Sequence, residues 1–184
     1  MKTIMKIVMW ILIVFGTGVV GLLGYYFISV SGQVMEVTWD EVIIEKMEEM
    51  EVEDGDDIQD FGLNAEQVRD FEENPEKYRY IIFVMEFINR SNMAGVVDIK
   101  FKSQLPEELQ KRLVWIQNEP LANYLPPSES RGDGVSAIIR LEEGDTEQEI
   151  LDMAKKARIT ITGQKVGLLK RHGSYSITVT FSRN

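Results

Sequence analysis

The chain has 184 residues, no cysteine and one histidine, and its formal net charge at pH 7 is −10. The lack of cysteine excludes disulfides, thiolate metal sites and cysteine nucleophiles. The single histidine excludes a metal site built from several histidines. The acidic excess comes from residues 36–76, which hold 17 acidic and 2 basic side chains, whereas no acidic residue follows Asp152. Such asymmetry is found on ordinary solvated surfaces and also serves partner recognition.

An uncharged segment of 24 residues, Ile7–Val30, stands out near the N-terminus. A membrane-spanning helix needs about 20 apolar residues, and 24 residues at ~1.5 Å each extend ~36 Å. In lipid only a helix satisfies the backbone hydrogen bonds of such a segment from within itself. We therefore predict that residues 1–31 form a short cytoplasmic stub and a transmembrane signal-anchor helix.

The charges that flank this segment predict its orientation. Lys2 and Lys6 precede it, and the first charged residue after it is Glu36. By the positive-inside rule the N-terminus stays in the cytoplasm and the remainder is translocated to the extracytoplasmic side of the cell membrane. The alternative is a cleaved signal peptide, for which Ser29-Val30-Ser31 would be the cleavage site. The apolar run is longer than the ~7–15 residues of a usual signal peptide, which favours a retained anchor.

Small residues cluster on the predicted membrane helix. The spacing Thr17-x-x-x-Gly21 allows a second helix to approach closely. We therefore predict a protein partner, or self-association, through a helix-packing face formed by Thr17, Gly18, Gly21 and Gly24.

Residues 32–76 are predicted to form an acidic neck with short helices. Within it, Val34–Val52 shows apolar residues at helical spacing and the capping-box pattern Thr38-x-x-Glu41. The segment Glu51–Asp60 is the most acidic of the chain, but it lacks the EF-hand spacing of glycine and final glutamate, so a charged linker is favoured over a calcium site. Asn64 is expected to cap a helix that runs through Glu73.

The remaining residues, 77–184, are predicted to form mainly strands. Tyr78–Ile88 is apolar on both faces and predicts a central strand, and the alternation of Tyr175–Phe181 predicts a strand with one buried face. A long loop is expected over Pro120–Gly134 and a hairpin turn at Arg171–Gly173. One inserted helix is expected after Thr146, in a capping box with Glu149. Further strands are predicted at Val97–Phe101, Leu113–Gln117, Val135–Leu141 and from Ile159.

This pattern of short strands with loops rich in proline and glycine predicts an antiparallel β-sandwich. The stretches FVMEFINRSN and LPPSESRGDGVSAIIRL resemble strands and turns of the Ig-like domains displayed by many Gram-positive envelope proteins. The resemblance covers Tyr78–Phe181. It implies a mainly β chain in which an N-terminal transmembrane helix precedes an Ig-like sandwich, a class of binding and structural modules without shared catalytic residues.

No motif for catalysis is evident. His172 is predicted to lie in a turn, Arg131-Gly132-Asp133 is expected in a loop for turn reasons, and Asn89-Arg90-Ser91 is a sequon that matters only in a eukaryotic secretory pathway. No cofactor, metal or nucleic acid is expected. A basic C-terminal patch is the candidate surface for an anionic polymer and comprises Lys155, Lys156, Arg158, Lys165, Lys170 and Arg171.

The sequence therefore predicts a membrane-anchored extracytoplasmic scaffold or accessory protein of a membrane complex. The alternative is a ligand-binding or sensor module for an envelope polymer or a cation. An enzyme is the least favoured class, because no pair of the 30 acidic residues stands out as a catalytic pair.

Overall fold

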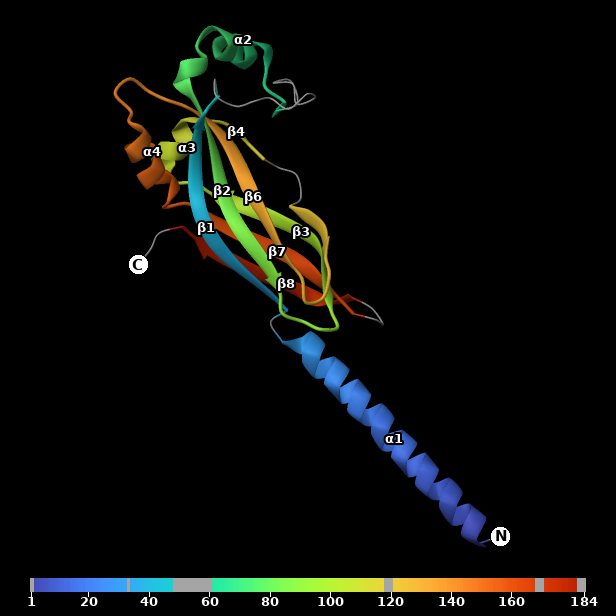
Figure 1. Cartoon of the computed structure of the whole chain (residues 1–184). Helices are drawn as coiled ribbons and strands as arrows, with labels where there is room; N and C mark the ends of the chain where they lie inside the picture. Colours follow the sequence, from blue (N-terminus) through green and yellow to red (C-terminus); the bar gives the residue numbers. More distant parts are fainter. Residues whose placement is uncertain (1, 33, 48–60, 118–120, 168–170, 182–184) are drawn as a thin grey trace.

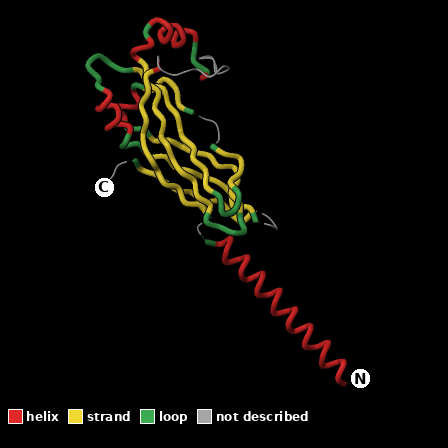
Figure 2. Tube along the Cα trace, viewed as in Figure 1, coloured by secondary structure: helices red, strands yellow, loops and turns green. Residues whose placement is uncertain are grey.

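The computed structural model describes residues 2–32, 34–47, 61–117, 121–167 and 171–181. A long helix, α1 (Lys2–Ser31), leads into two antiparallel four-stranded sheets that face each other (Figures 1 and 2). This arrangement confirms the predicted class: a mainly β sandwich that follows an apolar N-terminal helix.

The first sheet has the order β1-β2-β6-β4. Strand β2 is flanked by β1 and β6, as its two apolar faces predict. Its inward side chains, among them Ile81, Phe83 and Met85, are almost fully buried. The strands of this sheet are β1 (Met35–Lys46), β2 (Tyr78–Asn89), β6 (Ser130–Arg140) and β4 (Leu113–Ile116).

The second sheet has the order β5-β3-β7-β8. The predicted alternation of the last strand is confirmed, because Tyr175, Ile177, Val179 and Phe181 all belong to the core between the sheets. Trp39 of the first sheet lies beside Phe181, with the two rings 6.0 Å apart. The strands of this sheet are β5 (Ala122–Leu125), β3 (Gly95–Gln104), β7 (Arg158–Val166) and β8 (Arg171–Thr180).

Short helices gather at the end of the sandwich opposite α1 (Figure 1). Two of the three predicted helix caps are present: Asn64 forms a capping box with Gln67, and Thr146 forms one with Glu149. The helices are α2 (Ala65–Glu73), the 3-10 turn η3 (Pro75–Lys77), α3 (Glu107–Lys111) and α4 (Glu147–Ala154).

The predicted amphipathic helix over Val34–Val52 is wrong, because Met35–Lys46 is strand β1. This strand pairs with β2 along its whole length, and the pairing outweighs the weak local preference that Thr38 and Glu41 give for a helix start. A one-residue bulge between Trp39 and Val42 shifts the alternation. The bulge lets Met35, Val37, Trp39, Val42 and Ile44 all pack on the main core, whereas Ile43 and Met47, which follow Trp39 at helical spacing, do not belong to that core.

Three further expectations needed correction. The loop predicted over Pro120–Gly134 contains β5 and the first part of β6. The turn predicted at Arg171–Gly173 lies within β8, because Arg171 pairs with Val166. In β3 a bulge at Asp98, whose φ is 54°, turns Val97 away from the core and lets Val96 and Ile99 both point inward.

Helix α2 packs on the outer face of the first sheet at the end opposite α1 (Figure 1). Met47, Phe71, Tyr78 and Ile138 form a second buried cluster there, separate from the main core. Residues 48–60, which contain the whole of the predicted charged linker Glu51–Asp60, lie outside the described residues.

Candidate functional site

Helix α1 contains a segment that is long and apolar enough to cross a membrane. The segment Met5–Phe27 has 23 residues and a mean hydropathy of 2.4, and every side chain in it except that of Tyr26 is exposed. At ~1.5 Å per residue it extends ~34 Å, slightly more than the ~30 Å hydrocarbon core of a bilayer. Large apolar side chains such as Trp10, Phe15 and Leu22 are more than half exposed.

The small-residue face predicted on α1 is open. A Cβ atom added at Gly18, Gly21 or Gly24 would meet no atom within 4 Å. The hydroxyl of Thr17 donates to the carbonyl oxygens of Ile13 and Val14, at 2.8 Å and 3.0 Å. Because this hydroxyl is already satisfied within its own helix, Thr17 offers a neighbouring helix a small surface rather than an unpaired polar group. Helix pairing through this face stays a prediction.

The C-terminal end of α1 joins the sandwich without a spacer. Tyr26 is 5% exposed and belongs to the main core, together with Val34 and Met35 at the start of β1. The ammonium group of Lys165 in β7 donates to the Gly32 carbonyl oxygen at 2.6 Å. Both sheets therefore contact the segment that leaves the helix, so the sandwich is placed directly at the end of the candidate span.

The six residues of the predicted basic patch are not gathered on one surface. Lys155, Lys156 and Arg158 lie where α4 leads into β7, whereas Lys165 lies at the other end of β7, beside Gly32. Seven residues of strand separate Arg158 from Lys165, which is ~23 Å. The backbone of Arg171 pairs with Val166 at the Lys165 end, and Lys170 lies outside the described residues.

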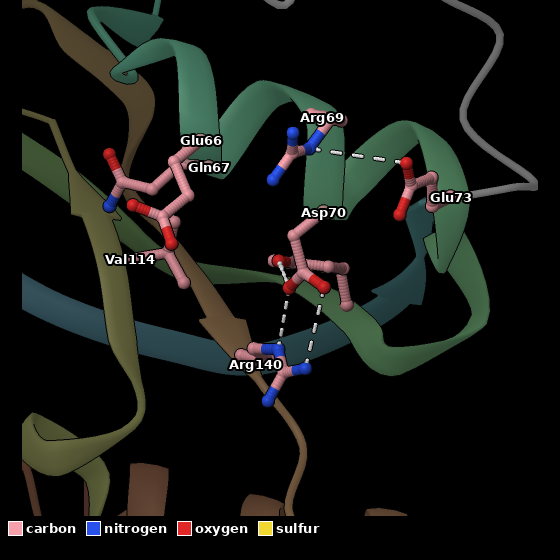
Figure 3. A pocket seen from close by; sticks show the side chains of 8 residues that line it. Glu66, Gln67, Arg69, Asp70, Glu73, Val114 and Arg140 are labelled. Atoms are coloured by element: carbon pink, nitrogen blue, oxygen red, sulfur yellow. Dashed lines mark hydrogen bonds and ion pairs between the residues drawn. The ribbon is translucent and has the colours of Figure 1, made fainter.

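A depression of about 450 Å³ lies between α2 and the outer face of the first sheet (Figure 3). Asp70 of α2 points across it to Arg140 at the end of β6, with Oδ2 2.8 Å from the guanidinium Nε. The Tyr78 hydroxyl of β2 donates to the same Oδ2. Glu66, Arg69 and Glu73 line the outer part of the depression. The Asp70 carboxylate and the Arg140 guanidinium are thus already paired with each other. We interpret this pair as a structural link that holds α2 against the sheet.

This fastening shifts the pKa values of its members. The hydrogen bonds from Tyr78 and Arg140 lower the pKa of Asp70 below its ordinary value of 3.8. Burial, and then the hydrogen bond to Asp70, raises the pKa of Tyr78 to about 12. The contribution of Tyr78 to stability is therefore complete below pH 10 and is lost as the pH rises to about 12, whereas that of Asp70 is lost as the pH falls through its lowered pKa.

We expect the substitution Asp70→Asn to lower the pKa of Tyr78 from about 12 towards its ordinary value of 10. It should not reach 10, because burial of the phenol persists while the carboxylate charge is lost. Carbon NMR of labelled tyrosine over a pH titration measures this shift. The control is Glu73→Gln on the same helix, whose partner Arg69 is 4.0 Å away, and a Tyr78 pKa that is equally unchanged in both variants would contradict the assignment.

Two more ion pairs hold the helices at this end of the sandwich. Arg112, which follows α3, donates through Nε and one terminal nitrogen to the two carboxylate oxygens of Asp145, at 2.8 Å and 3.0 Å. Arg79 of β2 contacts Glu147 of α4 at 3.1 Å. All three guanidinium pairs join residues at least 33 positions apart in sequence, so no local pattern identified them. Their geometry is that of structural cross-links.

The motifs considered for other chemistry lie in structural positions. Arg131 and Asp133 belong to β6 and face each other at 3.5 Å instead of extending from a loop. Asn89 of the sequon is 1% exposed, and its amide donates to the carbonyl oxygens of Ala94, Leu125 and Pro126. Within the part of the chain that the structure describes, no three His, Asp or Glu side chains gather as metal ligands.

No protein-family model matches the chain, and no curated protein matches it either.

Proposed function

We propose that this protein is a single-pass membrane protein that displays a β-sandwich outside the cytoplasm and acts as a scaffold or accessory subunit of a membrane complex. The observation that supports it is the candidate span of α1, which is exposed from Met5 to Tyr25 and continues into the sandwich core through Tyr26 and Val34. Lys2 and Lys6 before the span favour a cytoplasmic N-terminus by the positive-inside rule. The strand sequences resemble those of Ig-like domains of Gram-positive envelope proteins, in keeping with a structural or binding module.

The proposed contact surface is the open face of α1. In lipid, apolar side chains alone provide no hydrophobic driving force for two helices to associate, whereas small residues allow close backbone contact. Thr17, Gly21 and Gly24 lie on one side of the helix and Gly18 lies beside them, at spacings of three and four residues. The alternative function, a sensor for an anionic polymer, has less support, because the described basic residues assigned to it lie at both ends of β7 and not on one surface.

The test replaces Gly18, Gly21 and Gly24 by leucine in the full chain. We expect the associated species, either a self-assembled form or a co-purified membrane protein, to be largely lost in mild detergent, because leucine side chains keep the helices apart. Native mass analysis measures the associated fraction. The control is Val19→Leu, which changes the opposite side of the helix. Association that survives all three glycine substitutions would contradict the proposal.

A further inference from the structure

One exposed aromatic residue distinguishes the membrane end of the sandwich. Among the described residues outside α1, Tyr124 is the sole exposed large apolar residue, with 50% of its surface accessible. It lies on β5, an edge strand of the second sheet. Its ring covers Gly95, the first residue of β3, and a Cβ atom added at Gly95 would lie 2.9 Å from its Cζ.

The pairing of the strands places Tyr124 close to the level of the anchor. Val97 of β3 is paired both with Tyr124 and with Gln164, which is the neighbour of Lys165. Along the strands, Tyr124 is therefore about one residue, ~3.3 Å, farther from α1 than Lys165. The ammonium group of Lys165 in turn contacts the Gly32 carbonyl oxygen at 2.6 Å.

The dimensions of a bilayer then give the surroundings of Tyr124. The headgroup layer adds ~5–7 Å to each side of the hydrocarbon core. Residues 28–31 of α1 extend ~6 Å beyond the span that ends at Phe27, so Gly32 lies at the level of the headgroups. Tyrosine is enriched at this level because its ring is apolar and its hydroxyl is polar.

We propose that the α1 end of the second sheet is a lipid-contact surface, in which Tyr124 enters the headgroup layer of the bilayer that α1 spans. This inference rests on the proposed function, because it requires α1 to cross the membrane. The inference rests on an aromatic contact and not on net charge, because the arginines at this end have acidic partners. Arg90 is paired with Glu36 at 2.9 Å and Arg131 with Asp133 at 3.5 Å. With Tyr124 in the headgroups and α1 in the core, the sandwich has two points of attachment and a fixed tilt.

The absence of native cysteine allows a direct test with single labelled cysteines in the full chain. The chain is placed in nanodiscs of phosphatidylcholine and phosphatidylglycerol, and a bimane probe is attached at Asn123→Cys, beside the intact Tyr124. A control probe is attached at Arg158→Cys, at the far end of β7. Lipids with a nitroxide on the headgroup quench a probe that lies in the headgroup layer.

We expect headgroup quenching at position 123 to be several-fold stronger than at position 158, and to fall when Tyr124→Ser is added. Equal quenching at the two positions would overturn the inference, and so would quenching at position 123 that is unchanged by Tyr124→Ser. A third probe at Val14→Cys, read with a nitroxide deep in the acyl chain, tests the span itself. Strong deep quenching at 14 without headgroup quenching at 123 overturns the lipid contact and leaves the anchor in place, whereas no quenching at 14 overturns both.

Discussion

Replacing Phe181 by alanine is expected to destabilise the sandwich by about 3–5 kcal/mol, the usual cost of removing a buried phenylalanine. Phe181 has no exposed surface although it follows the last strand. Its ring lies 5.2 Å from that of Phe83 and 6.0 Å from that of Trp39, both of the opposite sheet. Truncation of this ring leaves a cavity between the two layers, because the flanking strands cannot close it without losing their pairing.

Urea unfolding of the full chain in detergent, followed by near-ultraviolet circular dichroism of its aromatic side chains, measures the loss. The control is Thr180→Ala, one residue earlier on β8, which is exposed and should change stability by less than ~0.5 kcal/mol. If the two variants unfold at the same urea concentration, Phe181 does not join the sheets in the way its position indicates.

The same residue shows what the sequence was able to predict. The strict alternation from Tyr175 to Phe181 is a period-2 signal that reports directly on burial, and the structure places each of the apolar members in the core. The capping boxes at Asn64 and Thr146 were also predictable, because a cap depends on residues three positions apart. The spanning length of α1 depends only on composition along one segment.

The features that were missed depend on partners distant in sequence. Strand β1 forms because β2 offers a free edge, and the helical spacing of Trp39, Ile43 and Met47 carries no signal of that pairing. The candidate depression depends on Asp70 meeting Arg140, 70 positions away, and neither residue carries a local signal of that contact. The basic residues near the C-terminus were predicted to form one patch because they are close in sequence. Strand β7 nevertheless separates Arg158 from Lys165, because an extended strand lengthens by ~3.3 Å for each residue.

Two glycines under tyrosine rings provide the second prediction. A Cβ atom at Gly163 of β7 would lie 2.6 Å from Cζ of Tyr175, and one at Gly95 of β3 would lie 2.9 Å from Cζ of Tyr124. The two sites share this close approach but differ in burial. The Tyr175 phenol packs against the core, its hydroxyl contacts the Met35 sulfur at 3.3 Å, and burial raises its pKa, whereas Tyr124 is half exposed.

We therefore expect Gly163→Ala to cost about 1–3 kcal/mol, the usual penalty for overpacking, because Tyr175 must give up its packing against the core and its contact with Met35 to make room. Gly95→Ala should cost less than ~1 kcal/mol, because Tyr124 can swing outward into solvent or lipid headgroups. Urea unfolding of both variants in detergent compares them directly. Equal costs would mean that contact with the ring, and not the burial of the ring, decides the penalty. A larger cost at Gly95 would mean that Tyr124 is held as firmly as a core residue.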